Sequence, residues 1–305
     1  MIARAGRGGR KVIDTVVGFI GLGVMGEPMC RNLRVKSGRR VVGFDLRAEP
    51  LARLAQHGVE RAQSAGAVVR ESDIVFASLP SGKELDALAR GGDGLLANIR
   101  REAIFVDLGT SPVGLTRELA AEVERKGAAY LDAPVARTRQ AAESGTLAVM
   151  VGGDAEHLRR VRPLIECFAS EITHCGAIGS GQVTKILNNM VLFQTVAALS
   201  EAYAIARRAG MDPAVLFEAL SKGSADSFAL RNHGMKAILP QQFPERAFSV
   251  EYAKKDLSYA KEMAQAGGVE AGGAENVARL FEMAIANGLG EQYFPVISRM
   301  LDEGV

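Results

Sequence analysis

The sequence lacks any long apolar run and any strong excess of charge of one sign. No segment reaches the roughly 18 consecutive apolar residues that a membrane-spanning helix requires. Its 37 basic and 35 acidic residues give a formal net charge of +2, so no strong field favours nucleic acid or a membrane surface as a partner. With 48% hydrophobic and 24% charged residues, the composition is typical of a soluble globular protein.

Residues that bind metals are few and scattered. The three cysteines, Cys30, Cys167 and Cys175, have no metal-type spacing, and the four histidines form no ligand pattern, so we expect no metal. An odd number of cysteines favours free thiols in a reducing cytoplasm. The basic, glycine-rich stretch 4–11 has no apolar segment of a secretory signal. We expect residues 1–13 to be a flexible tail, with a short targeting or anion-binding arm as the alternative.

The order of apolar runs predicts two domains, as a length of 305 residues also suggests. In the first half, short runs rich in β-branched residues alternate with helical patterns such as 28–35 and 50–57. This alternation indicates a parallel sheet covered on both faces and joined by right-handed crossovers. The expected strands are 15–20, 41–45, 74–78, 104–107, 129–132 and 148–152.

The second half has only helical patterns. Between Gly181 and about Arg208 no proline or glycine interrupts the apolar periodicity, which predicts a helix of about 28 residues, about 40 Å long. We therefore expect a doubly wound α/β domain over residues 1–178 and an all-helical domain over 179–305, joined by this long helix. Breaks between the later helices are expected at 210–213, 223–224, 239–244 and 267–273.

A glycine-rich segment follows the first expected strand and opens the next helix. Gly21-Leu22-Gly23-Val24-Met25-Gly26 matches the pattern G-x-G-x-x-G. In this pattern the first glycine permits a tight turn, the second lets the backbone approach pyrophosphate, and the third lets helix and strand pack closely. The segment predicts a Rossmann-type dinucleotide site.

Further residues of this site are expected where the strands end. Asp45 ends the second strand about twenty residues after the last glycine, where a carboxylate accepts hydrogen bonds from ribose hydroxyls and favours NAD. Arg47 keeps NADP as the alternative, because a guanidinium there could pair with the 2′-phosphate. The other expected cofactor contacts are Leu46, Leu79, Pro80 and Thr110, since ligands of open parallel sheets lie beyond the carboxyl ends of the strands.

Five more segments accompany the glycine pattern in a distinctive order. They are Asp132-Ala133-Pro134-Val135, Gly145-Thr146-Leu147, Val151-Gly152-Gly153, Gly181-Gln182-Val183-Thr184-Lys185-Ile186-Leu187-Asn188-Asn189 and Lys255-Asp256-Leu257. Together the segments resemble the β-hydroxyacid dehydrogenase family, which includes 3-hydroxyisobutyrate dehydrogenase and tartronate semialdehyde reductase, over nearly the whole chain from Val16. The resemblance implies an NAD(P)-dependent oxidoreductase that interconverts a small 3-hydroxy acid and its semialdehyde or keto form. It also implies a homodimer or homotetramer.

The segment around Lys185 predicts the catalytic residues. Lys185, Asn188 and Asn189 share one face of the long helix, because they are three and four residues apart. A partly buried lysine beside a substrate hydroxyl can take its proton during oxidation and return one during reduction. We predict Lys185 as the acid/base, Asn189 as the residue that orients the substrate oxygen, and Asn188 as a substrate contact.

The resemblance places two further residues near the nicotinamide and the substrate. They are Lys255 and Phe248, although Phe248 fits a role in the hydrophobic core equally well. Asp256 is expected to be a structural cap or the partner of a neighbouring lysine.

The chain departs from its family after Val135. Most members carry Ser-Gly-Gly there, whereas this chain has Ala136-Arg137-Thr138, a pair of Arg and Thr that resembles the sulfolactaldehyde reductase branch. A guanidinium offers a planar fork of donors that suits an oxyanion. We expect these three positions, Arg137 and Thr138 above all, to bind the acid group of the substrate, whether carboxylate or sulfonate. The alternative is that Arg137 points to solvent and backbone amides bind that group.

Two other functions remain open at this point. One is a decarboxylating enzyme like 6-phosphogluconate dehydrogenase, which the short helical half and the absence of an obvious basic phosphate cluster disfavour. The other is a non-catalytic dinucleotide-binding or scaffold protein, which the presence of Lys185 and Asn189 disfavours.

Overall fold

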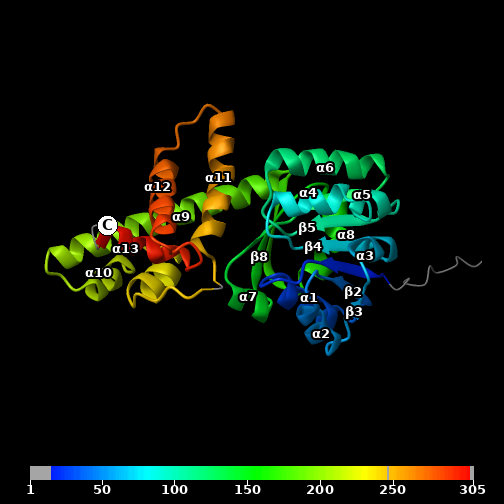
Figure 1. Ribbon diagram of the computed structural model, residues 1–305, viewed down its shortest axis with the longest axis horizontal. Helices are drawn as coiled ribbons and strands as arrows, with labels where there is room; N and C mark the ends of the chain where they lie inside the picture. The colour runs from blue at the N-terminus through cyan, green and yellow to red at the C-terminus, as the bar shows by residue number, and fades with distance from the viewer. Residues whose placement is uncertain (1–14, 246, 303–305) are drawn as a thin grey trace, which may run out of the picture. The chain divides into compact units, whose positions relative to one another are not determined.

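The computed structural model describes residues 15–245 and 247–302, so the predicted tail 1–13 lies outside the described residues. The chain divides into two compact units, the first ending at Thr184 and the second beginning at Lys185. Figure 1 shows the elements of both units along the chain. The predicted domain boundary after residue 178 stays a prediction.

The first unit is built on one sheet. Within the described residues its strands lie in the order β3-β2-β1-β4-β5-β6-β8-β7, and β9 pairs with β8. The pairs from β3 to β6 are all parallel. The strands are β1 (Val17–Ile20), β2 (Val41–Phe44), β3 (Glu60–Arg61), β4 (Ile74–Ala77), β5 (Ile104–Asp107), β6 (Ala129–Asp132), β7 (Val135–Ala136), β8 (Leu147–Gly152) and β9 (Ala169–Gly176). All six predicted strands are present, which confirms the predicted alternation.

The predicted parallel sheet is a mixed sheet in the structure, and the departure from the prediction lies at β8. This strand runs antiparallel to both β6 and β7. The connection from β7 to β8 contains only one helix, the six-residue α7 (Arg139–Ser144), which rises about 9 Å. That is less than half of the roughly 20 Å length of a six-residue strand. A crossover helix of this length cannot carry the chain back along the sheet, so the strand returns in the opposite direction.

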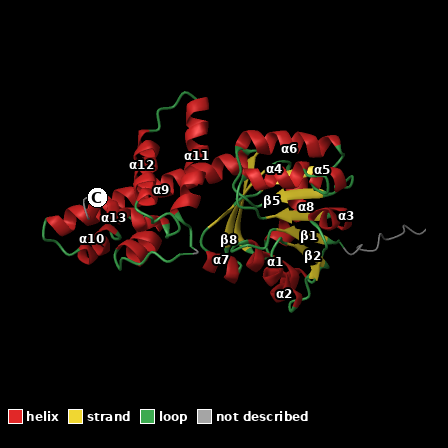
Figure 2. Cartoon of the chain, in the orientation of Figure 1, coloured by secondary structure: helices red, strands yellow, loops and turns green. Residues whose placement is uncertain are grey.

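Both faces of the sheet are covered by helices (Figure 2). Alternate residues of each strand point to opposite faces, so they enter two separate hydrophobic clusters. Phe76 and Val106 belong to the first cluster, and Val75 and Phe105 belong to the second. The cluster of Phe76 is closed by α1 (Gly26–Ser37), α2 (Ala48–Ala55) and α8 (Ala155–Ile165); the second is closed by α3 (Ala65–Glu71), α4 (Gly82–Arg90), α5 (Leu95–Asn98) and α6 (Val113–Arg125).

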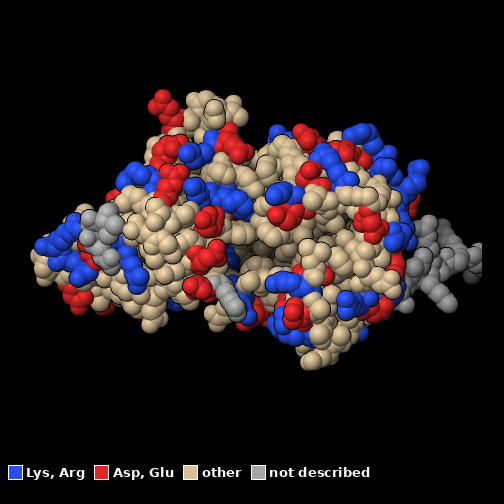
Figure 3. Space-filling model, in the orientation of Figure 1, with Lys and Arg blue, Asp and Glu red and all other residues tan. Residues whose placement is uncertain are grey.

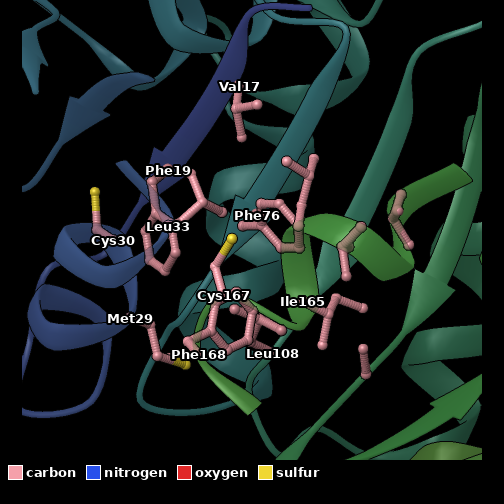
Figure 4. Packing of buried hydrophobic residues seen from close by; sticks show 14 of the residues in the cluster. Val17, Phe19, Met29, Cys30, Leu33, Phe76, Leu108, Ile165, Cys167 and Phe168 are labelled. Atoms are coloured by element: carbon pink, nitrogen blue, oxygen red, sulfur yellow. The ribbon is translucent and has the colours of Figure 1, made fainter. Parts of the chain in front are cut away.

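Phe76 lies at the centre of the first cluster (Figure 4). Its ring stacks on Phe19 with centroids 6.1 Å apart and meets the edge of Phe168 at 5.9 Å. The thiols of Cys30 and Cys167 are buried in the same cluster and are not in a disulfide. Burial of one such aromatic side chain contributes about 2–3 kcal/mol, and this packing fixes the β1 and β4 ends that border the glycine-rich loop.

The second unit is helical apart from isolated bridges among its described residues. Its elements are α9 (Ser180–Arg208), which begins in the first unit, α10 (Pro213–Leu220), the π-helix η1 (Leu230–Ile238), α11 (Val250–Ala266), α12 (Gly272–Ala286), the 3₁₀ turn η2 (Phe294–Val296) and α13 (Ile297–Asp302). Helix α9 has 29 residues, which confirms the predicted long helix. Each predicted break lies between two successive elements or overlaps the start of the next, as 213 does with α10 and 272–273 do with α12. The core of this unit surrounds Phe193, whose ring contacts Phe248, Phe281 and Phe294.

No helix in the described part of the chain combines the length and the apolar character of a membrane-spanning helix. On the face that Figure 3 shows, basic and acidic side chains are interspersed on each unit.

Candidate active site

The glycine-rich loop joins β1 to the start of α1. Gly21 has a φ of 85°, and a Cβ on it would lie 2.3 Å from the carbonyl oxygen of Ser78. A Cβ on Gly26 would lie 2.0 Å from the carbonyl oxygen of Gly21. Gly23 differs, because a Cβ there would meet nothing closer than the Arg47 guanidinium at 3.9 Å. The first and third glycines are therefore required by the chain's own packing, whereas the second leaves open space where pyrophosphate would approach.

Asp45 follows β2 and faces this loop. Its Oδ2 accepts a hydrogen bond from the Leu22 amide at 2.7 Å, and its Oδ1 accepts from the amide and the Nε of Arg47 at 2.8 and 3.1 Å. Although partial burial by itself raises the pKa of Asp45, the bonds from Arg47 and Leu22 hold it below its ordinary value. The carboxylate stays ionised and is oriented before any cofactor binds.

Three of the other predicted cofactor residues differ in exposure. Leu46 is 94% exposed next to Asp45, as an apolar side chain would be if it covered a flat ring. Leu79 is half-buried against the second cluster of the sheet. Thr110 is buried in the loop after β5. The loops that carry them, together with that of Pro80, leave the carboxyl ends of the parallel strands β2, β4 and β5; β4 and β5 are neighbours, and β1 lies between β2 and β4.

In the second unit, Lys185 begins a chain of hydrogen bonds. Its Nζ donates to Oδ1 of Asn189 at 3.0 Å, and the same oxygen accepts from Nδ2 of Asn188 at 3.2 Å. Asn189 in turn donates from its own Nδ2 to Oδ2 of Asp256 at 2.7 Å. Lys185 is 9% exposed and Asn189 is 1% exposed. The three predicted residues of α9 are thus brought together as the sequence spacing implied.

Burial is the main influence on the proton affinity of Lys185. It lowers the pKa of Lys185, the positive charge of Lys255 lowers it further, and the carboxylate of Asp256 opposes both. A lysine with a lowered pKa gives up its proton more readily than an exposed lysine does. This is the property that an acid/base residue needs.

Asp256 contacts two of the predicted site residues, Asn189 and Lys255, whereas the sequence predicted only a cap or a lysine partner. Besides its bond to Asn189 it forms an ion pair with Lys255, with Nζ and Oδ1 2.9 Å apart, which confirms the predicted lysine partner. Lys255 also lies over the rings of Tyr252 and Tyr259, at 4.0 and 5.4 Å from their centroids. The sequence signal for the bond to Asn189 was slight, because Asp256 and Asn189 are 67 positions apart.

Arg137 lies between β7 and α7 with a φ of 85°, in the left-handed region that favours glycine. Its Nη1 donates to the carbonyl oxygen of Thr146 at 2.6 Å and to the hydroxyl of Ser170 at 2.9 Å. Thr138 caps α7, since its hydroxyl accepts from the amide of Ala141 at 3.4 Å. The side chain of Arg137 is exposed but held in one direction by its partners.

Two predicted substrate residues lie within the packing of their own units. Ala136 is buried in β7. Phe248 is half-buried, and its ring lies 5.6 Å from that of Phe193 and 5.5 Å from that of Phe294. Of the two roles that the sequence allowed for Phe248, the structure shows the one in the hydrophobic core.

Comparison with known proteins gives the family. The NAD binding domain of 6-phosphogluconate dehydrogenase matches residues 16–176, and the NAD-binding domain of NADP-dependent 3-hydroxyisobutyrate dehydrogenase matches 179–301. The 3-hydroxyisobutyrate dehydrogenase of Pseudomonas aeruginosa is 37% identical over 83% of this chain and 86% of its own length. The chain belongs to the β-hydroxyacid dehydrogenase family.

Other members of this family cover the chain almost completely. The NAD-dependent L-serine dehydrogenase of Pseudomonas aeruginosa is 33% identical over 94% of this chain and 97% of its own. The structure of Mycobacterium tuberculosis 3-hydroxyisobutyrate dehydrogenase with L-serine has a TM-score of 0.86 and 34% identity over 95% of this chain and 99% of that one. The chain described here is therefore an NAD(P)-dependent hydroxyacid dehydrogenase that acts on a CH–OH group. The alternative of a non-catalytic dinucleotide-binding protein is set aside.

Proposed function

We propose that this enzyme interconverts a small 3-hydroxy acid and its semialdehyde, with NAD as the preferred cofactor. The observation that carries the proposal is the buried chain from Lys185 through Asn189 to Asp256. It supplies one group of lowered proton affinity and one amide whose direction is fixed by a carboxylate.

Lys185 would accept the proton of the substrate hydroxyl during oxidation and return a proton to the carbonyl oxygen during reduction. Asn189 would hold the same oxygen, and Asn188 would extend the polar contact from the next position. Asp256 fixes the amide of Asn189, because its carboxylate accepts from Nδ2 and so leaves Oδ1 toward Lys185. The bound nicotinamide would supply the hydride acceptor or donor.

The preference for NAD is supported by Asp45. Its ionised carboxylate lies beside the Leu22 amide, where it would accept from the ribose hydroxyls and repel a 2′-phosphate. Arg47 is the group that could reverse this preference, but its Nε is already paired with Asp45. The exposed Leu46 would cover the adenine, and the loops of Leu79, Pro80 and Thr110 would border the rest of the dinucleotide.

The acid group of the substrate is proposed to bind at residues 136–138. Arg137 is fixed through Nη1, and the planar fork of a guanidinium can bind an oxyanion with its remaining edge. A carboxylate is the first choice, because the relative named for L-serine acts on a 3-hydroxy acid with a carboxylate. A sulfonate, as in sulfolactaldehyde, is the second candidate, since Arg137-Thr138 replaces the Gly-Gly of most members.

Initial rates with a substrate panel test this proposal. The panel holds 3-hydroxyisobutyrate, L-serine, glycerate, 4-hydroxybutyrate, 3-hydroxypropionate and dihydroxypropanesulfonate, with succinic and tartronate semialdehydes and sulfolactaldehyde for the reverse direction, each with NAD and NADP. The proposal expects turnover of a 3-hydroxy carboxylate with a lower KM for NAD. A preference for a sulfonate would replace the first choice with the second, and a preference for NADP would overturn the role of Asp45.

Lys185→Met tests the acid/base role. Loss of general acid–base catalysis should lower kcat by a factor of about 10²–10⁴ with NADH binding unchanged. The matched control is Lys254→Met, which removes a half-buried lysine of α11 that pairs with Glu282. A Lys185→Met enzyme with the kcat of the control would refute the assignment.

Two predictions from the sequence stay predictions. Size-exclusion chromatography with light scattering tests for the expected homodimer or homotetramer. Fractionation of the source cells tests for the expected cytoplasmic location.

A further inference from the structure

Two aspartates of the first unit are fully buried at the ends of neighbouring strands. Asp107 ends β5 and Asp132 ends β6, and they lie opposite each other in the parallel ladder. Neither aspartate belongs to the site described above. A buried carboxylate is costly unless donors surround it, so the partners of this pair indicate why they are present.

The partners of Asp132 lie at the start of α9, one just before the helix and one in its first turn. Its Oδ1 accepts from the amide of Gly179 and its Oδ2 from the amide of Gln182, each at 2.8 Å. These amides have no partner within the helix, so Asp132 is a cap supplied from a distant strand. The fit is close, because a Cβ on Gly181 would lie 2.8 Å from Asp132 Oδ2.

The partners of Asp107 belong to the loop that follows β5. Its Oδ1 accepts from the amide of Gly109 at 2.9 Å. Its Oδ2 is within 3.3 Å of the hydroxyl of Ser111 and within 3.5 Å of the phenol of Tyr130. This loop carries Thr110.

Gln182 joins these two sets. Its Oε1 accepts from the amide of Ser111 at 3.0 Å, while its Nε2 donates to the carbonyl oxygen of Gly109 at 2.9 Å and lies 3.3 Å from Oδ2 of Asp107. Its side chain is fully buried. One amide thus uses both its acceptor and its donors on the backbone on either side of Thr110, which only glutamine or a similar amide can do.

We propose that Gln182 is a positioning residue that clamps the loop from Gly109 to Ser111 onto the first turn of α9, and that this clamp sets the affinity for the cofactor. Lys185 follows Gln182 by three residues along the chain. The inference rests on the proposed function only in placing Thr110 at the cofactor.

The charged and titratable groups around Gln182 allow a specific test. Asp107 on β5 and Asp132 and Tyr130 on β6 face it, and Arg117 of α6 packs on Gly179. The pKa of Asp107 is raised to about 7, chiefly by burial; the bond from the Gly109 amide opposes this rise, and the charge of Asp132 adds to it. In the native protein the ionised form of Asp107 accepts all of its donors, so a rise in pH preserves or strengthens the clamp.

Gln182→Glu reverses this dependence on pH. The new carboxyl group would lie beside Asp107, and the two would share one proton, because two carboxylates at such a distance cannot both ionise readily. While the proton is held, a hydrogen bond between residues 182 and 107 remains; when it is lost at higher pH, two negative charges face each other. Gln182→Met keeps the length of the side chain and removes the clamp at every pH.

The experiment measures two quantities from about pH 6 to about pH 9, the range that brackets the titration of such a pair. One is the Kd for NADH, and the other is the hydrogen-exchange protection of the peptide containing 109–111, corrected for intrinsic exchange. Gln194→Glu, the same chemical change further along α9, is the matched control. Thermal unfolding at each pH shows which variants are folded.

We expect Gln182→Glu to lose about tenfold in NADH affinity across this range, together with protection of the loop, while the native enzyme and Gln194→Glu do not. Gln182→Met should bind NADH more weakly than the native enzyme at every pH, but its affinity should not fall as the pH rises. Equal and pH-independent effects of Gln182→Glu and Gln182→Met would overturn the clamp and leave the dehydrogenase function untouched. A pH-dependent loss of protection with unchanged NADH affinity would overturn the link from the loop to the cofactor.

Discussion

Replacing Asp256 with asparagine removes one buried negative charge while the shape of the side chain is kept. The carboxylate accepts from Asn189 at 2.7 Å and pairs with Lys255 at 2.9 Å. A hydrogen bond to a charged acceptor is about twice as strong as a neutral one, and the difference is about 1 kcal/mol. If Asn189 holds the substrate oxygen in the transition state, kcat/KM should fall by about fivefold at the optimal pH.

The same substitution should change the dependence on pH. Asp256 is the group that raises the pKa of Lys185 against the effects of burial and of Lys255. Oxidation needs the neutral amine, so its rate rises with pH as Lys185 loses its proton. Without the carboxylate the pKa of Lys185 is lower, and the rising limb of kcat/KM for oxidation moves to lower pH.

The assay is the pH profile of kcat/KM for alcohol oxidation at saturating cofactor. Asp226→Asn is the matched control, because Asp226 is a more exposed carboxylate of the same unit whose partner is Arg231. A rising limb that stays in place, or that moves equally in the control, would refute the electrostatic coupling between Asp256 and Lys185. A limb that moves to higher pH would refute the assigned sign of this coupling, in which the carboxylate of Asp256 raises the pKa of Lys185.

Three further predictions concern the first unit. Asp45→Ala should weaken NADH binding by about tenfold and narrow the preference for NADH over NADPH. Calorimetry measures the Kd for both cofactors, and an unchanged ratio of the two Kd values would refute the role of Asp45. Gly26→Ala should destabilise the protein by about 2 kcal/mol or more, because the new Cβ would lie 2.0 Å from the Gly21 oxygen; Gly114→Ala, where nothing lies within 4 Å, should not lower Tm, and equal melting curves would contradict the packing argument. Arg137→Gly should relieve about 1 kcal/mol of backbone strain and raise KM for the acid substrate, so an unchanged KM would remove Arg137 from substrate binding.

The long-range part of the site could not be predicted from spacing. Lys185, Asn188 and Asn189 share a helix face because they are three and four residues apart, and this much follows from helix geometry alone. The carboxylate that completes their hydrogen bonds comes from α11, and nothing in helical periodicity says which face of α11 packs on α9. Arg137 is a second case, because its partners Thr146 and Ser170 are brought to it by the antiparallel return of β8 and by β9.

The sequence by itself determined the alternation of strands and helices, the glycine pattern with its following carboxylate, and the uninterrupted helix that carries Lys185. These features depend on local periodicity and on the conformational freedom of glycine, which are properties of neighbouring residues. Tertiary structure alone decided the direction of β8, the partner of Asn189 and the convergence of Asp107, Asp132 and Gln182. Those contacts join segments up to 75 positions apart, and their existence depends on how strands and helices pack after the chain has folded.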